Sequence, residues 1–174
     1  MTLQLTAEQV WKEIEQNLFA ILGMVTPTGE ARTVGIVYIV DDGKLYIGTQ
    51  KAAWKAKHIA RNPHVSLSIP LAKHIPFMPW IKIPAATISF SGTAGVLEHS
   101  EVRVEVLKKL YRNAMKDQKA MAESCVLEVT PQGEFITYGV GISLMQMRFP
   151  GKARGRVAIA TPQQVIAMAE DLSH

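Results

Sequence analysis

The sequence predicts a mainly β fold, a β-barrel with α-helices around it. Short apolar or alternating segments of strand length recur through the first hundred residues and are separated by turn residues. The first three segments are joined by tight turns, which is typical of an antiparallel meander and not of a βαβ unit. About six strands with apolar faces favour a closed or nearly closed barrel. The length of 174 residues fits a single domain spanning 1–174.

The N-terminal segment predicts a helix followed by a buried strand. Residues 6–9, Thr-Ala-Glu-Gln, have the form of a capping box, and apolar residues follow at helical spacing. We therefore expect a helix over about residues 7–17. The run Phe19–Val25 is continuously apolar apart from one glycine, which suits a buried strand.

Two further strands complete the meander. Residues 26–29, Thr-Pro-Thr-Gly, predict a turn, because proline presets one φ angle and glycine permits a positive one. The segment Arg32–Val40 is a second strand, apolar on both faces. Asp41–Gly43 closes a hairpin, and Lys44–Thr49 is the third strand.

A short basic helix is expected after Thr49. Lys51 and Lys55 lie four residues apart on one face of it, away from its alanine-rich apolar stripe. The Asn-Pro pair at 62–63 ends the helix, because the residue before proline disfavours helical angles. Val65–Ile69 is then a fourth strand.

The segment 70–84 is rich in proline and in large apolar residues, so regular structure is not expected there. It forms either a lid over the protein's own core, a wall for a flat ligand, or a dimer contact. Further elements follow it. They are a strand over Ala86–Leu97, a helix capped by Ser100 and running to about Asp117, one or two strands over Cys125–Thr130 and Glu134–Tyr138, a basic C-terminal tail 148–174, and within it a terminal helix over Pro162–Leu172.

Several function classes lack support in the sequence. The single cysteine, Cys125, excludes an internal disulfide framework and a cysteine-based zinc site, and its apolar strand predicts a buried structural thiol. The five histidines show no metal-ligand spacing, and no phosphate-loop, dinucleotide or serine-hydrolase motif occurs. No nucleic-acid motif and no membrane-spanning run are found, so we expect a cytoplasmic protein that binds neither nucleic acid nor membrane.

The positive charge is concentrated in one part of the chain. Between Gly43 and Leu97 there are seven Lys/Arg residues and no Asp or Glu, although the formal net charge of the whole chain is only +4. Thr49 can cap the following helix, and Lys51 and Lys55 add charge beside it. Helix starts with nearby cations bind phosphate, so an anion site is one interpretation. A basic helix face that only keeps the protein soluble is the other.

The motifs resemble those of the pyridoxamine 5′-phosphate oxidase-like proteins, the FMN-binding split-barrel superfamily. The resemblance covers Phe19 to about Ile69 well and extends more loosely to Tyr138. It rests on an ordered set of short motifs, none of which is a strict signature alone. They are Arg32-Thr-Val34, Tyr46-Ile-Gly-Thr49, Lys55, and Asn62-Pro-His-Val-Ser-Leu67.

The resemblance implies a six-stranded antiparallel Greek-key split barrel that pairs as a homodimer, with FMN at the subunit interface. It implies a flavoprotein oxidoreductase whose substrate and catalytic residues are unknown. Carried over by position, the site residues fall on three segments. Arg32, Thr33 and Val34 would line the ring and ribityl chain, Gly48, Thr49 and Gln50 would follow along the flavin, and Lys51 and Lys55 would meet the phosphate.

The sequence also departs from the family pattern. Ala53 and Trp54 stand where the family often has a serine and an arginine that bind phosphate, and the C-terminal substrate pattern of the true oxidase has no match, so pyridoxamine phosphate oxidation is not expected. Two alternatives stay open, an F420-binding oxidoreductase and a non-catalytic protein that binds FMN or binds haem through a histidine such as His74. No side chain is assigned as a general acid or base, since Tyr38 and Tyr138 fit packing roles better.

Overall fold

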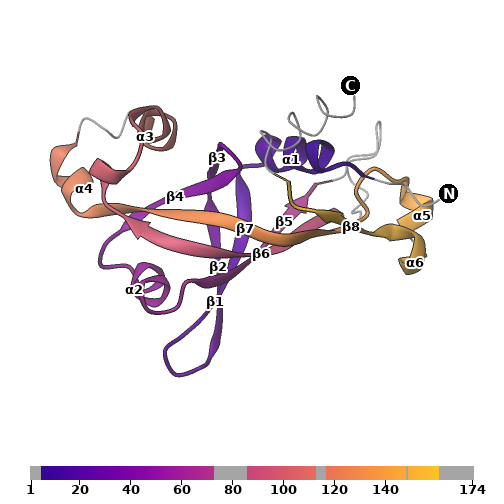
Figure 1. Cartoon of the computed structure of the whole chain (residues 1–174), viewed down its shortest axis with the longest axis horizontal. Coiled ribbons are helices and arrows are strands. Elements are labelled where there is room, and N and C mark those ends of the chain that lie inside the picture. Colours follow the sequence, from indigo (N-terminus) through magenta and orange to yellow (C-terminus); the bar gives the residue numbers. More distant parts are fainter. Residues whose placement is uncertain (1–4, 73–85, 113–116, 148, 161–174) are drawn as a thin grey trace, which may run out of the picture.

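The computed structural model describes residues 5–72, 86–112, 117–147 and 149–160. Its helices are short and lie around one sheet (Figure 1). They are α1 (Ala7–Gln16), α2 (Trp54–Arg61), α3 (Val104–Tyr111), α4 (Gln118–Ala122), α5 (Leu144–Met147), α6 (Pro150–Ala153) and a 3-10 turn η1 (His99–Glu101). The strands are β1 (Phe19–Val25), β2 (Ala31–Val37), β3 (Ile39–Asp41), β4 (Lys44–Gln50), β5 (His64–Leu71), β6 (Ala86–Leu97), β7 (Ser124–Tyr138) and β8 (Arg154–Ala158).

All strands join one curled antiparallel sheet in the order β2-β1-β5-β6-β7-β4-β3, with β8 pairing onto β7. This confirms the prediction of a mainly β antiparallel split barrel with peripheral helices. The sheet has eight strands where six were expected. One extra strand arises because the predicted strand Arg32–Val40 is interrupted at Tyr38 into β2 and β3. The other is β8, which forms within the basic tail.

The main core fills the inside of the curled sheet. Phe135 is fully buried and makes edge-to-face contacts with Trp11 and Phe90, at ring-centroid distances of 5.3 and 5.4 Å. Helix α1 supplies Trp11 to this core and begins with the predicted capping box on Thr6. The hydroxyl of buried Tyr38 donates to the Ile14 carbonyl at 2.8 Å, which ties the end of α1 to the sheet.

A second apolar cluster lies where α3 packs against β3 and β4. Its buried members are Tyr46, Val102, Val106, Leu107 and Val126. The predicted helix from Ser100 to Asp117 is wrong in its bounds. Residues 99–101 form η1, whose capping box uses Glu98 and Glu101, and α3 starts only at Val104. It ends at Tyr111, because the next residue, Arg112, has a φ of 42° that an α-helix does not tolerate.

Other predictions have mixed outcomes. The one or two strands predicted over Cys125–Thr130 and Glu134–Tyr138 are one continuous strand, β7, and Cys125 is buried in it, where burial raises the pKa of its thiol. The tail 148–174 was not expected to hold α6 and β8. Most of the segment 70–84, including His74, and the expected terminal helix over 162–172 lie outside the described residues. Within the described residues, no helix is long and apolar enough to cross a membrane.

Candidate functional site

The site residues predicted from sequence lie on strands at the two sides of an opening in the barrel. Strand β2 is the last strand of the sheet path and is hydrogen-bonded only to β1, so the backbone groups along its other edge make no ladder in the described structure. Strand β4 pairs with β7 through Gln50, but its pairing with β3 ends at Tyr46. We call the space between the free edges of β2 and β4 the seam.

The two edges come close to each other. Continuing the β3–β4 pairing past its last pair would set Gly48 opposite Val37 and Gln50 opposite Gly35. Strands β2 and β4 also come into contact without pairing. The predicted residues Gly48, Thr49 and Gln50 therefore lie on the β4 side of the seam, and Arg32, Thr33 and Val34 lie on β2 just past the residues that this register sets opposite them. Free backbone donors and acceptors are available to a planar polar ligand at such an edge.

Side chains alternate across the seam strand β2. Val34 packs partly against the main core, whereas Thr33 is exposed on the outer face. Arg32 is exposed as well, and its guanidinium pairs with the carboxylate of Glu30 at 2.9 Å. This exposed pair is weakly held, because two solvated side chains gain little from pairing, and Arg32 is free to turn toward a stronger anion.

The lysines predicted to bind phosphate have different settings. The Lys51 ammonium is 2.6 Å from the carboxylate of Glu98, the first acidic residue after the acid-free segment. Lys55 is half-buried in the first turn of α2, and no acidic partner of it occurs among the described residues. Of the two predicted phosphate ligands, only Lys55 is thus uncommitted.

The expected helix cap at Thr49 is wrong. Helix α2 starts at Trp54, so its N-cap is Ala53, which has no side chain that can bond the first N–H groups. The reason is that residues 50–53 form a turn, in which the Ala53 N–H donates to the Gln50 carbonyl at 3.0 Å. The first N–H groups of α2 consequently keep no side-chain cap, and no acidic residue lies in the first turn of the helix.

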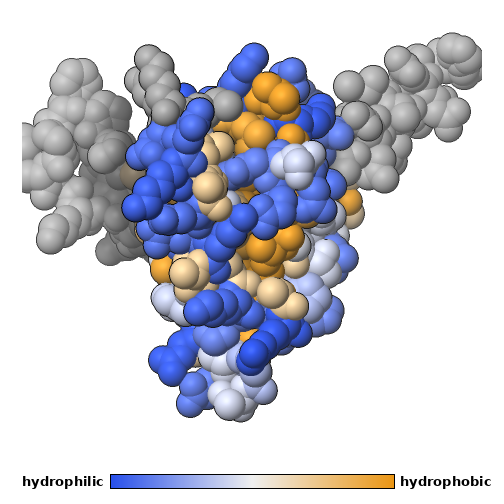
Figure 2. All heavy atoms as spheres, turned by 90° about the vertical axis from the view of Figure 1, so that its left-hand side faces the viewer, coloured by the Kyte–Doolittle hydropathy of each residue, from blue (hydrophilic) through white to orange (hydrophobic). Residues whose placement is uncertain are grey.

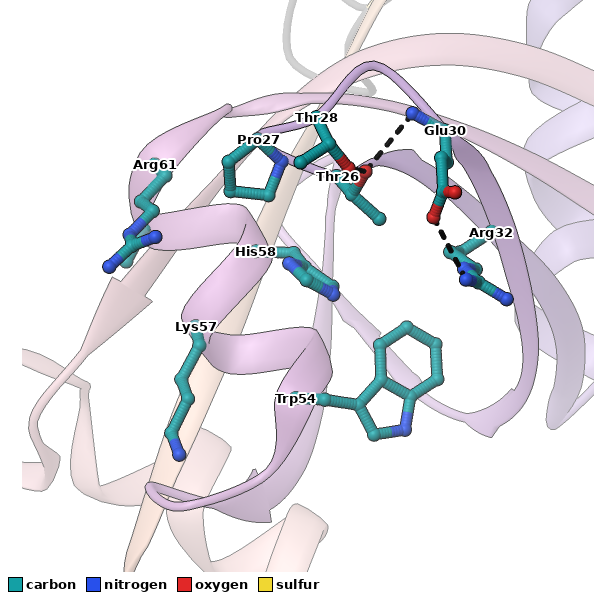
Figure 3. Close-up of a pocket in the computed structure, with 10 residues that line it drawn as sticks. Thr26, Pro27, Thr28, Glu30, Arg32, Trp54, Lys57, His58 and Arg61 are labelled. Carbon is teal, nitrogen blue, oxygen red and sulfur yellow. Dashed lines mark hydrogen bonds and ion pairs between the residues drawn. The ribbon is translucent and has the colours of Figure 1, made fainter.

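A cavity of about 810 Å³ lies between α2 and the β1–β2 turn, next to the β2 side of the seam (Figure 3). Its lining includes Arg32 and five residues of α2, and Glu30 is its one acidic member. The α2 residues are Trp54, Lys57, His58, Ala60 and Arg61. Figure 3 shows Trp54 and His58 pointing from α2 toward the turn and Arg32, with Lys57 pointing away from the turn. We call this cavity the Arg32 pocket.

A polar cluster supports β4 from the side of α3. The ring of Tyr111 packs on Gly48, where an added Cβ would lie 3.1 Å from the ring, so any larger residue at 48 would displace it. The Tyr111 hydroxyl donates to the Cys125 carbonyl at 3.2 Å and contacts the His99 Nε2 at 3.0 Å. Burial raises the pKa of Tyr111, so the phenol stays neutral and acts as a rigid support for this side of the seam.

Cationic side chains and strand edges without a ladder partner are the groups that this part of the molecule presents. Among the described residues, no group of three His, Cys, Asp or Glu side chains could hold a metal ion. The face over α2, α3 and α4 is mainly hydrophilic, with apolar residues in small separate areas (Figure 2).

The antiparallel split barrel with a seam defines the structural class, and comparison with known proteins gives the family. Residues 6–138 match the family model described as pyridoxamine 5′-phosphate oxidase. The match covers more than half of the chain, so the protein belongs to this family. No curated protein is similar enough to count as a match.

Solved structures share the fold at low identity. A haem-binding protein from Mycobacterium smegmatis is 15% identical, with a TM-score of 0.66 over 96% of this chain and 62% of its own. HutZ, a haem storage protein from Vibrio cholerae, is 16% identical, with a TM-score of 0.61 over 78% of this chain and 96% of its own. A protein described as an F420 reductase is 18% identical, with a TM-score of 0.52 over 71% of this chain and 93% of its own. At these identities the likeness shows the fold alone.

Sequence reasoning missed two features of the site. Glu98 lies one residue beyond the acid-free segment, and its pairing with Lys51 depends on the β4 and β6 ends being brought together through β7. The α2 residues Trp54, His58 and Arg61 were assigned no role, although their spacing of four and three residues places them on one helix face. That spacing was the available signal.

Proposed function

We propose that this protein is an FMN-binding flavoprotein, an oxidoreductase whose substrate is unidentified, with FMN held along the seam. The observation that carries the proposal is the seam, whose two free edges carry Arg32–Val34 on β2 and Gly48–Gln50 on β4, and whose β2 side ends beside the cationic Arg32 pocket. A flavin has a flat hydrogen-bonding ring and one phosphate, and this combination matches both parts of the site. Family membership supports the same assignment.

The chain's residues would divide the binding between charge and backbone. Arg32 offers a planar fork that binds a phosphate through two hydrogen bonds, and Lys55 offers a point charge at the uncapped start of α2. Backbone groups of β2 and β4 would orient the ring and ribityl chain, with Val34 as apolar support. Bound FMN supplies electron transfer, while the protein orients it and limits solvent access.

The missing family ligands at Ala53 and Trp54 have local substitutes. The Arg32 pocket contains Lys57, His58 and Arg61, so positive charge is present one helical turn further along α2. Trp54 is 45% exposed and stacks edge-on with His58 at a ring distance of 5.6 Å. Lys55 does not line the Arg32 pocket, so this pocket would offer the phosphate a second set of cations beside Lys55.

Two alternatives remain as second candidates for specific reasons. The F420 reductase and the two haem proteins share this fold, and F420 carries a phosphate that would suit the same cations. Haem would need an axial ligand, and the histidine suggested from sequence, His74, lies outside the described residues. Among the described residues, His58 is the histidine that lines the Arg32 pocket.

The test of the proposed function is the visible spectrum of freshly purified protein, with mass spectrometry of any molecule released on denaturation. FMN is expected, with flavin bands that shift when the apoprotein is reloaded with FMN in a titration. A Soret band would assign haem instead. A colourless protein that binds F420 and not FMN would assign the deazaflavin. Bound FMN without turnover of any electron donor would identify the protein as an FMN carrier and contradict the proposed oxidoreductase activity.

We further propose that two copies of the chain pair through the outer face of β1 and β2, beside the seam. This face exposes four large apolar side chains, of which Phe19 and Val37 are direct neighbours across the two strands. The others are Ile21 and Val25. Exposed apolar surface of this extent is characteristic of a contact between protein chains. The self-complementary pairing of a two-fold dimer needs only this one surface.

The dimer is tested by light scattering during size-exclusion chromatography of the purified chain. A dimer mass is expected, and Val37→Glu, which would bury a charge within the contact, is expected to give monomer. A monomer mass for the unmodified chain would contradict the proposal. Lys12→Glu on the exposed side of α1 is the control and leaves the mass unchanged.

A further inference from the structure

A second cavity of about 410 Å³ lies at the other end of the sheet, where β6, β7 and β8 run side by side (Figure 1). It shares no lining residue with the Arg32 pocket, and the strands β1, β5, β6 and β7 separate β2 from β8. Its lining contains two arginines and no acidic residue. Its lining residues include Thr87, Ser89, Ile136, Tyr138, Arg154 and Arg156. We call it the β8 cavity.

The register builds the β8 cavity from two parallel rows across three strands. Thr87 pairs with Tyr138, which pairs with Arg154. The adjacent row runs from Ser89 through Ile136 to Arg156. Because residues two apart on a strand share a face, both arginines stand on the same face of β8, about 7 Å apart along the strand.

Each row has the same chemical order. A hydroxyl of β6 stands on one side, a large side chain of β7 forms the floor, and an arginine of β8 stands on the other side. The hydroxyls and the arginines are two strand spacings apart, about 10 Å, which leaves room for a small molecule over Ile136 and Tyr138. Tyr138 is fixed in place, because its hydroxyl donates to the Met147 carbonyl at 3.0 Å.

The two arginines differ in whether a carboxylate already pairs with the guanidinium group. Both are exposed. The Arg156 guanidinium contacts the Glu134 carboxylate at 3.1 Å, with both side chains largely in solvent. Arg154 has no ion-pair partner within the described part of the chain. One guanidinium is therefore open to an anion, and the other can exchange a weak surface pair for a better one.

We propose that the β8 cavity is a binding site for a small molecule that carries a carboxylate or a phosphate. Arg154 and Arg156 bind the oxyanion, the hydroxyls of Thr87 and Ser89 bind its polar remainder, and Ile136 and Tyr138 contact its apolar part. The β8 cavity lies apart from the seam, so its assignment as an anion site does not depend on which cofactor the seam binds. In an oxidoreductase, this cavity would bind a second ligand besides the cofactor, and that ligand would be an organic anion.

The test is an NMR titration of the full-length, isotope-labelled protein with two probes, inorganic phosphate and succinate. The Nε–Hε signals of Arg154 and Arg156 are expected to shift saturably with at least one probe. Arg154→Gln is expected to raise the Kd about tenfold or more, as the loss of a charge-assisted contact requires. Glu134→Gln, which frees Arg156, is expected to lower the Kd severalfold. The matched control Lys12→Gln removes one exposed positive charge elsewhere and leaves the Kd unchanged.

The outcomes separate the possibilities. A response to phosphate alone or to succinate alone supports the site and assigns which oxyanion it prefers. The proposal is overturned if the two arginine signals do not saturate, if Lys12→Gln weakens binding as much as Arg154→Gln, or if only Arg32 and Arg61 respond. Flavin content is measured on the same variants. Loss of anion binding with flavin retained defines the β8 cavity independently, whereas absence of flavin with anion binding intact contradicts only the proposed function.

Discussion

Replacing Lys55 by alanine is expected to weaken FMN binding by roughly 10- to 100-fold, the loss that accompanies one charge-assisted hydrogen bond. Lys55 is half-buried at the start of α2, with no acidic partner among the described residues, so its charge is available to a phosphate. The measurement is fluorescence quenching of FMN titrated with apoprotein, at fixed ionic strength because charge contacts are screened by salt.

Three companion variants make the result specific. Arg32→Ala is expected to lose a similar factor, since Arg32 lies both on β2 at the seam and in the cationic pocket. Lys51→Ala is expected to lose less, because Glu98 already holds that ammonium at 2.6 Å. Glu98→Gln is expected to tighten binding if Lys51 turns to the phosphate. Unchanged FMN affinity in Lys55→Ala would overturn the assignment of the phosphate site.

Phe135→Ala is expected to lower the free energy of unfolding by about 3–5 kcal/mol, the range for a large aromatic residue removed from a core. Phe135 is fully buried and joins Trp11 of α1 to Phe90 of β6. Its removal deletes both edge-to-face contacts and leaves a cavity that the surrounding rings cannot fill.

Urea denaturation followed by tryptophan fluorescence measures this change, at one protein concentration because self-association would raise the apparent stability. Val104→Ala is the matched control, since Val104 is 54% exposed on α3. Its cost is expected to stay within about 0.5 kcal/mol. A loss below about 1.5 kcal/mol for Phe135→Ala would show that the core repacks around the missing ring.

Much of the fold could be predicted from local sequence patterns. The capping box at Thr6, the turn residues at 26–29 and the alternation in Ala86–Leu97 each correspond to an element that the structure contains. These signals are local, because caps and turns depend on residues three or four apart. The split of β2 from β3 at Tyr38 was not visible, since the strand pattern continues through it.

The parts that could not be predicted depend on contacts between distant segments. Strand β8 is recognisable only by its pairing with β7, and its arginine-rich sequence read as a tail. The pairing of Lys51 with Glu98 joins residues 47 positions apart, which no local pattern encodes. The prediction of a helix cap at Thr49 was wrong because a turn intervenes before α2. From sequence alone, a polar residue near a helix start can be placed at the cap or one or two residues before it.

The unpaired edge of β2 has a consequence for handling the protein. A free strand edge is a template on which another chain can add a strand, and such edges lead to aggregation when nothing covers them. The outer face of the same strand is apolar at Val37, and Arg32 is the one charged side chain within β2. Preparations stripped of whatever normally occupies this edge should therefore lose solubility first through β2, and a ligand that restores solubility would be one that lies along it.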